Sequence, residues 1–194
     1  MTILTAKVGN NSDLFPDILD VYANKYDVII DVTYGKGVFW RNVDISKYTF
    51  HPSDILTGVD YNHLPYKNDS VDIMVFDPPY MGHNGGKGYA VARNYNVDVP
   101  KYHKDYIPRL YFGAMAESTR VLRKGGHLII KCQDEIQSGK QNMNHITIIQ
   151  HAIESGWRVE DLFILVQKGT PIMRHPYQKH ARKNHSYFVV LRKM

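Results

Sequence analysis

The chain has 194 residues, of which 43% are hydrophobic and 22% charged, a length that gives one sizeable core and excludes two ordinary domains. Twenty-four Lys and Arg outnumber 19 Asp and Glu, so the formal net charge is +5 and a polyanionic partner is a reasonable first expectation. The single cysteine, Cys132, excludes an internal disulfide. No apolar run follows a basic start, so we expect no secretion signal. No apolar stretch approaches the roughly 18 to 20 residues of a membrane span. We therefore expect a cytoplasmic protein with no membrane partner.

In chain order, the sequence predicts a helix over Asp13–Ala23 with Ser12 as its N-cap, a strand over Asp27–Val32, a short helix or turn around Phe39–Val43, and strands near Tyr48–Phe50, Ile55–Val59 and Val71–Phe76. It then predicts a helix over Tyr106–Leu122, a turn at Lys124–Gly126, a strand over His127–Cys132, a helix over Asn144–Glu154, and antiparallel strands over Arg158–Gln167 and Ser186–Leu191. This alternation is typical of a three-layer α/β fold, with a mostly parallel sheet and an antiparallel C-terminal strand.

An unusually long polar connection, Met81–Asp105, interrupts this pattern. Connections of this length inside a compact domain are usually functional, and here basic residues alternate with tyrosines, a combination that suits phosphates and unstacked bases. A second basic stretch, Arg174–His185, contains no acid and precedes the last strand; its three histidines lack the spacing of a metal site, so no metal is expected. The candidate substrate-binding residues in the two stretches are Lys87, Arg93, Lys101, Lys104, Arg182 and Lys183.

The most informative segment is the apolar strand Val71–Phe76, which ends in Asp77-Pro78-Pro79-Tyr80. In open parallel sheets, ligands bind at the carboxyl ends of the strands. The prolines have no N–H and fix φ, so the Asp77 carboxylate and the Pro78 carbonyl present only acceptors. Such a site suits a group with two N–H donors, such as an exocyclic amine, and Tyr80 offers a flat face for stacking a planar base.

A second strand end carries a glycine turn. Ile29–Val32 leads into Thr33-Tyr34-Gly35-Lys36-Gly37, where two glycines let the backbone pass close to a ligand. The segment is not a P-loop, because no Gly-Lys-Ser/Thr follows, and it lacks the third glycine of the dinucleotide fingerprint.

In this order, the two segments resemble the motifs of the class I S-adenosylmethionine-dependent amino-methyltransferases. Asp31–Gly37 is similar to their cofactor motif and Asp77-Pro78-Pro79-Tyr80 to their catalytic DPPY motif, while Leu64–Asp72 and Arg120–Lys131 are similar to the segments around the catalytic strand and the strand after it. The resemblance implies a Rossmann-like class I methyltransferase fold over residues 1–194 as a single domain. It also implies S-adenosyl-L-methionine as cofactor and residues 81–105 as a substrate-recognition loop.

The resemblance further implies individual site residues. Asp31, Thr33, Gly35 and Gly37 would line the methionine part of the cofactor, and Asp77, Pro78, Pro79 and Tyr80 would form the catalytic site. Two acids, Asp54 and Asp60, are candidates for holding the ribose or the adenine, and the sequence leaves the division of these roles open. The segment Leu14–Leu19 is either the element that precedes the cofactor motif in these enzymes or a plain amphipathic helix. Cys132 lies inside a predicted strand and is expected to be a core residue rather than a nucleophile.

The implied reaction is methyl transfer to an exocyclic amino group of a nucleic-acid base. Adenine N6 in DNA is the first expectation, because Asp at the first motif position resembles DNA adenine-N6 methyltransferases most closely. An RNA base, at guanine N2 or adenine N6, is the alternative, because guanine-N2 RNA enzymes also carry this motif and the chain has no block for a separate target-recognition domain. That shortness also fits a partner subunit or a homodimer. A non-catalytic partner subunit that keeps the fold is a third reading, against which the intact motif argues.

Overall fold

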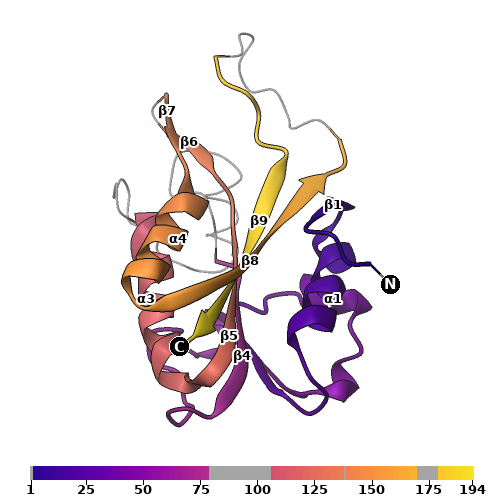
Figure 1. The fold of residues 1–194 in the computed structure, drawn as a ribbon, viewed down its shortest axis with the longest axis vertical. Coiled ribbons are helices and arrows are strands. Elements are labelled where there is room, and N and C mark those ends of the chain that lie inside the picture. Colours follow the sequence, from indigo (N-terminus) through magenta and orange to yellow (C-terminus); the bar gives the residue numbers. More distant parts are fainter. Residues whose placement is uncertain (1, 79–105, 138, 170–178) are drawn as a thin grey trace.

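The computed structural model describes residues 2–78, 106–137, 139–169 and 179–194 (Figure 1). The helices are α1 (Asn11–Tyr22), α3 (Tyr106–Val121) and α4 (Asn144–Glu154), with short 3-10 helices η1 (Val38–Asn42), η2 (Ile45–Lys47) and η3 (Ile55–Thr57). The strands are β1 (Ala6–Gly9), β2 (Val28–Asp31), β3 (Thr49–Pro52), β4 (Val71–Phe76), β5 (Leu122–Cys132), β6 (Glu135–Gln137), β7 (Lys140–Asn142), β8 (Trp157–Gln167) and β9 (His185–Lys193). Within these ranges, no helix is both long enough and apolar enough to cross a membrane.

A seven-stranded sheet forms the middle layer, in the order β1-β8-β9-β5-β4-β2-β3. Neighbouring strands are parallel except at β9, which runs antiparallel to both β5 and β8. Helix α1 covers one face, and α3 and α4 cover the other (Figure 1). The predicted three-layer α/β fold, with its antiparallel C-terminal strand, is confirmed.

The core has two halves, one on each face of the sheet. On β4, Met74 and Phe76 belong to the half beneath α3 and α4, whereas Ile73 and Val75 belong to the half beneath α1. A strand buried on both faces is apolar at successive positions, as Ile73–Phe76 are here, and β4 has the predicted bounds, Val71–Phe76.

Most of the other predicted elements are confirmed with small shifts at their ends. The helix predicted over Asp13–Ala23 begins at Asn11, because the N-cap is Asn10 rather than Ser12. The N–H of Asn10 donates to Asp13 Oδ2 at 2.8 Å and so fixes this end of the helix. The turn predicted at Lys124–Gly126 lies within β5, where Gly125 has a φ of 82° and the pairing with β4 shifts register.

The strand predicted over Ile55–Val59 is wrong. Residues Ile55–Thr57 form η3, because Asp54 Oδ1 accepts the N–H groups of Leu56 (2.7 Å) and Thr57 (3.2 Å) and so caps a helical turn. Ile55 and Leu56 are about half exposed, at 50% and 54%, so this apolar run does not enter the core. The sequence reading also missed β1 and the β6–β7 hairpin, whose strands are too short to show a hydrophobic period.

Candidate active site at the carboxyl ends of β2, β4 and β5

Three charged side chains meet where neighbouring strands end. Strands β2, β4 and β5 are parallel, with Asp31 paired to Val75, and Val75 paired to Ile129. Asp77 and Lys131 lie two residues beyond Val75 and Ile129. Because alternate residues of a strand point to the same face, all three charged side chains lie on the α1 face of the sheet, at the edge where open α/β sheets bind ligands.

Asp31 is buried, with 3% of its surface exposed, and its carboxylate is held by hydrogen bonds. Oδ2 accepts from Trp40 Nε1 at 2.7 Å, and Oδ1 accepts from the Thr33 N–H at 2.9 Å and the Thr33 hydroxyl at 3.3 Å. Burial raises the pKa of Asp31 to about 7; the hydrogen bonds from Trp40 and Thr33 oppose this rise, and the charge of Asp77 adds to it. A cation bound beside Asp31 would favour its ionised form near neutral pH.

The Thr33 hydroxyl connects the two acidic strand ends. Its oxygen accepts the backbone N–H of Asp77 at 2.7 Å while the same group donates to Asp31 Oδ1. The turn after β2 therefore fixes the backbone of β4 at the residue where the DPPY motif begins.

Lys131 stands beside Asp77 in a nearly closed environment. Its Nζ lies 3.8 Å from Asp77 Oδ1, and the lysine is only 4% exposed. The same Nζ lies 5.3 Å from the centroid of the Phe39 ring and 5.9 Å from that of Phe188, within the range of cation–π attraction. Burial lowers the pKa of Lys131, and the neighbouring Asp77 charge opposes that shift.

The glycine turn has the backbone that its sequence indicates. Gly35 and Gly37 have φ values of 52° and 62°, which L side chains rarely adopt. A Cβ on Gly37 would stand 2.5 Å from the Tyr34 hydroxyl oxygen. Gly37 is also the N-cap of η1, the element that carries Trp40 to Asp31, so this turn sets both the backbone path and the environment of the acid.

The two acids that the sequence left open have different surroundings. Asp54 is 9% exposed, and its Oδ2 accepts the N–H of Gly35 at 3.0 Å, which ties the end of β3 to the glycine turn. The side chain of Asp60 is 46% exposed. Hydrogen bonds from Asn62 and His63 lower the pKa of Asp60, the backbone N–H of Asn62 most of all.

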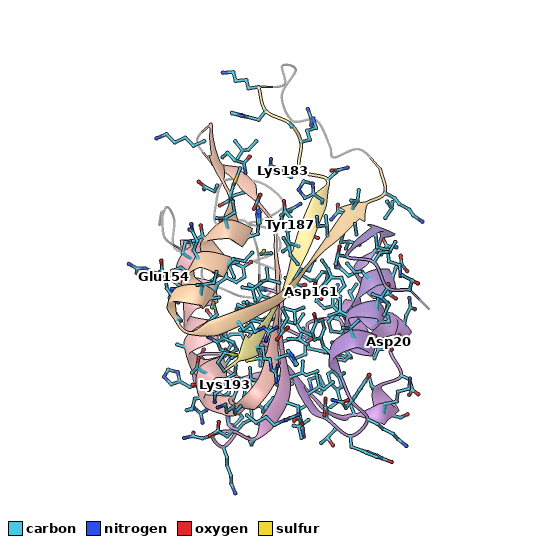
Figure 2. The ribbon with its side chains drawn as sticks, in the orientation of Figure 1. Asp20, Glu154, Asp161, Lys183, Tyr187 and Lys193 are labelled. Atoms are coloured by element: carbon cyan, nitrogen blue, oxygen red, sulfur yellow. The ribbon has the colours of Figure 1, made fainter. Side chains whose placement is uncertain are left out.

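The structure describes only part of the remaining predicted site. Pro78 is buried next to Asp77. Arg182 and Lys183 are half-buried and lie just before β9, near the carboxyl ends of the parallel strands; Figure 2 shows Lys183 there. Pro79, Tyr80 and the four basic residues Lys87, Arg93, Lys101 and Lys104 lie outside the described residues.

Sequence reasoning missed two residues of this site. Trp40 supplies a hydrogen bond to Asp31 from nine positions away, through η1, and no periodic pattern indicates it. Lys131 carried a signal, because lysine is almost never fully buried unless it is paired and here it interrupts the apolar run of a predicted core strand.

Cys132 and the other possible ligand groups do not form a second centre in the described residues. Burial raises the pKa of the Cys132 thiol well above its usual range, and the residue is fully buried, which fits the predicted core role. Across the parts of the chain that the structure describes, no three His, Cys, Asp or Glu side chains stand close enough to hold a metal ion.

Known proteins resemble this chain in fold. No protein-family model and no curated protein sequence matches it. A SAM-dependent methyltransferase from Methanosarcina mazei is 10% identical, with a TM-score of 0.56 over 91% of this chain and 97% of that one. An rRNA methylase from Streptococcus thermophilus is 14% identical, with a TM-score of 0.52 over 97% and 99%. The PvuII DNA methyltransferase, which is cytosine-N4-specific, is 9% identical, with a TM-score of 0.52 over 70% and 48%.

The likeness to these structures is one of architecture. The chain spans about half the length of the PvuII enzyme and of a further matched protein, 48% in each case. At identities of 9% to 14%, the matches are evidence for a shared fold only. Together with the strand order and the single antiparallel strand, they show that the chain has the Rossmann-like fold of class I methyltransferases.

Proposed function

We propose that this protein is an S-adenosyl-L-methionine-dependent methyltransferase that acts on an exocyclic amino group of a nucleic-acid base. One observation carries the proposal: two acids, Asp31 and Asp77, end adjacent parallel strands on one face and are linked through the Thr33 hydroxyl. The first acid opens a glycine turn and the second opens a DPPY sequence. We further propose that residues 1–194 act as one catalytic domain.

The residues at the end of β2 fit this cofactor. When bound, S-adenosyl-L-methionine supplies a methyl group on a positively charged sulfur. Asp31, whose buried carboxyl has a pKa of about 7, is suited to balance a cationic ligand, and a turn with Gly35 and Gly37 at positive φ follows it closely. Asp54 joins the end of β3 to that turn, so we assign the ribose hydroxyls to Asp54 and the adenine amine to the more exposed Asp60.

Asp77 and Pro78 would hold the substrate amine. An aromatic amine is a poor nucleophile because its lone pair is delocalised into the ring. Two N–H groups that donate to the Asp77 carboxylate and the Pro78 carbonyl favour a pyramidal nitrogen and align its lone pair with the methyl carbon. With the methyl group supplied by the bound cofactor, which would be left as a neutral thioether, Asp77 would accept the N–H proton that the amine releases.

Adenine N6 in DNA is the substrate we place first, from the resemblance of the DPPY motif. A base inside a duplex cannot reach such a site, so it would have to be flipped out, with Tyr80 as its stacking surface. Phosphate contacts are assigned to the 81–105 loop and to Arg182 and Lys183, which lie at the carboxyl edge of the sheet.

An RNA base is the second candidate. The observation in its favour is that the matched rRNA methylase and this chain cover each other almost completely, by 97% and 99%.

Nucleoside mass spectrometry tests the proposal directly. DNA and RNA are incubated separately with the protein and isotope-labelled cofactor, then digested and analysed for N6-methyladenine, N4-methylcytosine and N2-methylguanine. Label in N6-methyladenine from DNA supports the first substrate, and label in RNA supports the second. Asp77→Ala is the matched control, because it should bind cofactor and transfer nothing. Label found only in protein or small molecules, or in neither nucleic acid, contradicts the proposal.

A further inference from the structure

We propose that Lys131 is a positioning residue of this site, which keeps the Asp77 carboxylate ionised and turned toward the substrate amine. The inference rests on the proposed function, because it concerns the acid assigned to the amine. It goes beyond that function by assigning a role to Lys131, which acts through its contact with Asp77.

The packing around Lys131 fixes the position of its charge. The lysine leaves β5 on the α1 face, where its Nζ lies 5.3 Å from the Phe39 ring and 5.9 Å from the Phe188 ring. One ring comes from η1 and the other from β9, opposite Lys131 in the sheet. With only 4% of the residue exposed, the ammonium cannot extend into water. It is held 3.8 Å from Asp77 Oδ1.

The charge balance of the strand ends explains why a cation is needed there. Asp31 and Asp77 lie on the same face of adjacent strands, and the charge of Asp77 raises the pKa of Asp31. Two such carboxylates resist being ionised together. Lys131 offsets the charge of Asp77, which leaves Asp31 to balance the cationic cofactor. A protonated Asp77 would carry an O–H donor on the oxygen that the amine N–H needs as an acceptor.

Several titratable groups interact with Asp77, and they differ in whether they are charged near neutral pH. Asp31 faces it from β2 and Lys131 from β5, and Tyr111 of α3 and Cys132 of β5 also interact with it electrostatically. Burial raises the pKa of Tyr111 and of the Cys132 thiol far above neutrality, so both stay uncharged. Among the described residues, Lys131 and Asp31 are therefore the charged groups named here that act on Asp77 near neutral pH.

Lys131→Met is the decisive variant, because methionine keeps an unbranched chain between the two rings and removes the charge. The Asp77 carboxyl is followed by carbon NMR on protein labelled at aspartate, assigned by its loss in Asp77→Asn. Removing an opposite charge at this distance should raise the pKa of Asp77 by on the order of 1 to 3 units. Cofactor affinity at alkaline pH should be unchanged. The acid limb of kcat should move upward by the same interval, with activity recovering at high pH, and Lys131→Arg should restore part of the wild-type profile.

The reciprocal measurement, the pKa of Lys131 in Asp77→Asn, keeps the inference testable if Lys131→Met does not fold. In Asp77→Asn, the Lys131 ammonium loses its partner, so its own pKa should fall, as nitrogen NMR of lysine-labelled protein would detect. Unshifted titrations of both Asp77 and Lys131 would overturn the inference, as would a shifted Asp77 with an unchanged pH profile of kcat. If the wild-type protein methylates no nucleic acid, the proposed function fails separately, and the two NMR titrations alone decide whether Lys131 controls the charge of Asp77.

Discussion

Replacing Asp31 with Asn should change how the stability of the protein depends on pH. The carboxyl of Asp31 has a pKa of about 7 in the folded chain, against an ordinary value of 3.8. A raised folded-state pKa stabilises the fold most below the unfolded-state pKa, and this contribution is lost as pH rises through the folded-state value. Between pH 5 and 8.5, wild-type protein should lose on the order of 2 to 3 kcal/mol from this group alone.

The measurement is urea unfolding of wild type and Asp31→Asn at about pH 5 and pH 8.5, without cofactor. Other groups titrate in both proteins, so the quantity to compare is the difference between their free energies of unfolding. On going to the higher pH, this difference should shift in favour of Asp31→Asn by roughly 2 to 3 kcal/mol. Asp60→Asn is the control. The hydrogen bonds of Asp60 lower its pKa, so it is ionised at both values and should show no such change. If the free energies of unfolding of wild type and Asp31→Asn change equally between the two pH values, the raised pKa of Asp31 is refuted.

Three further predictions follow from the same site. Trp40→Phe removes the donor 2.7 Å from Asp31 Oδ2; a buried acceptor without its donor should cost about 1 to 3 kcal/mol in urea unfolding, more above neutral pH than below. Gly37→Ala places a Cβ 2.5 Å from the Tyr34 hydroxyl at a φ of 62°, so it should weaken cofactor binding in calorimetry, and adding Tyr34→Ala should restore part of the loss; equal binding by wild type and Gly37→Ala would contradict the role of the glycine turn in cofactor binding. The buried Cys132 thiol should react with iodoacetamide at pH 8 only after unfolding, and rapid labelling of native protein would contradict its core position.

The sequence predicts the frame of the site better than its internal contacts. Strand β4 is apolar except for Asp72 and is closed by Asp-Pro-Pro, so its bounds and its acid at the carboxyl end follow from local pattern. The neighbouring position of Asp31 and Asp77 follows from the parallel alternation of strands. The hydrogen bond from Trp40 does not, because it depends on a left-handed glycine and a 3-10 turn that no period reveals. The pairing of Lys131 with Asp77 requires the register of β4 against β5, which shifts at Gly125.

The capping of η3 shows a different limit. Ile55 and Leu56 read as part of a strand because only their apolarity is visible in sequence. The competing interaction is a side chain, Asp54, that accepts N–H groups from both sides, Gly35 on one strand end and Leu56 on the next turn. The sequence identifies Asp54 as a candidate for the cofactor, but no local pattern shows that the same carboxylate also caps η3 and binds the glycine turn.

The pairing of β1 with β8 has a consequence for how the chain acquires its structure. Ala6 pairs with Ile164, and the Tyr22 hydroxyl of α1 donates to Asp161 of β8, so β1 and this one contact of α1 depend on a strand that is made much later. At about 5 to 20 residues per second, the ribosome takes roughly 8 to 30 seconds to make the intervening residues. During that time the apolar face of α1 has no β8–β9 surface to cover. Strand β1 is therefore made well before the strand it pairs with.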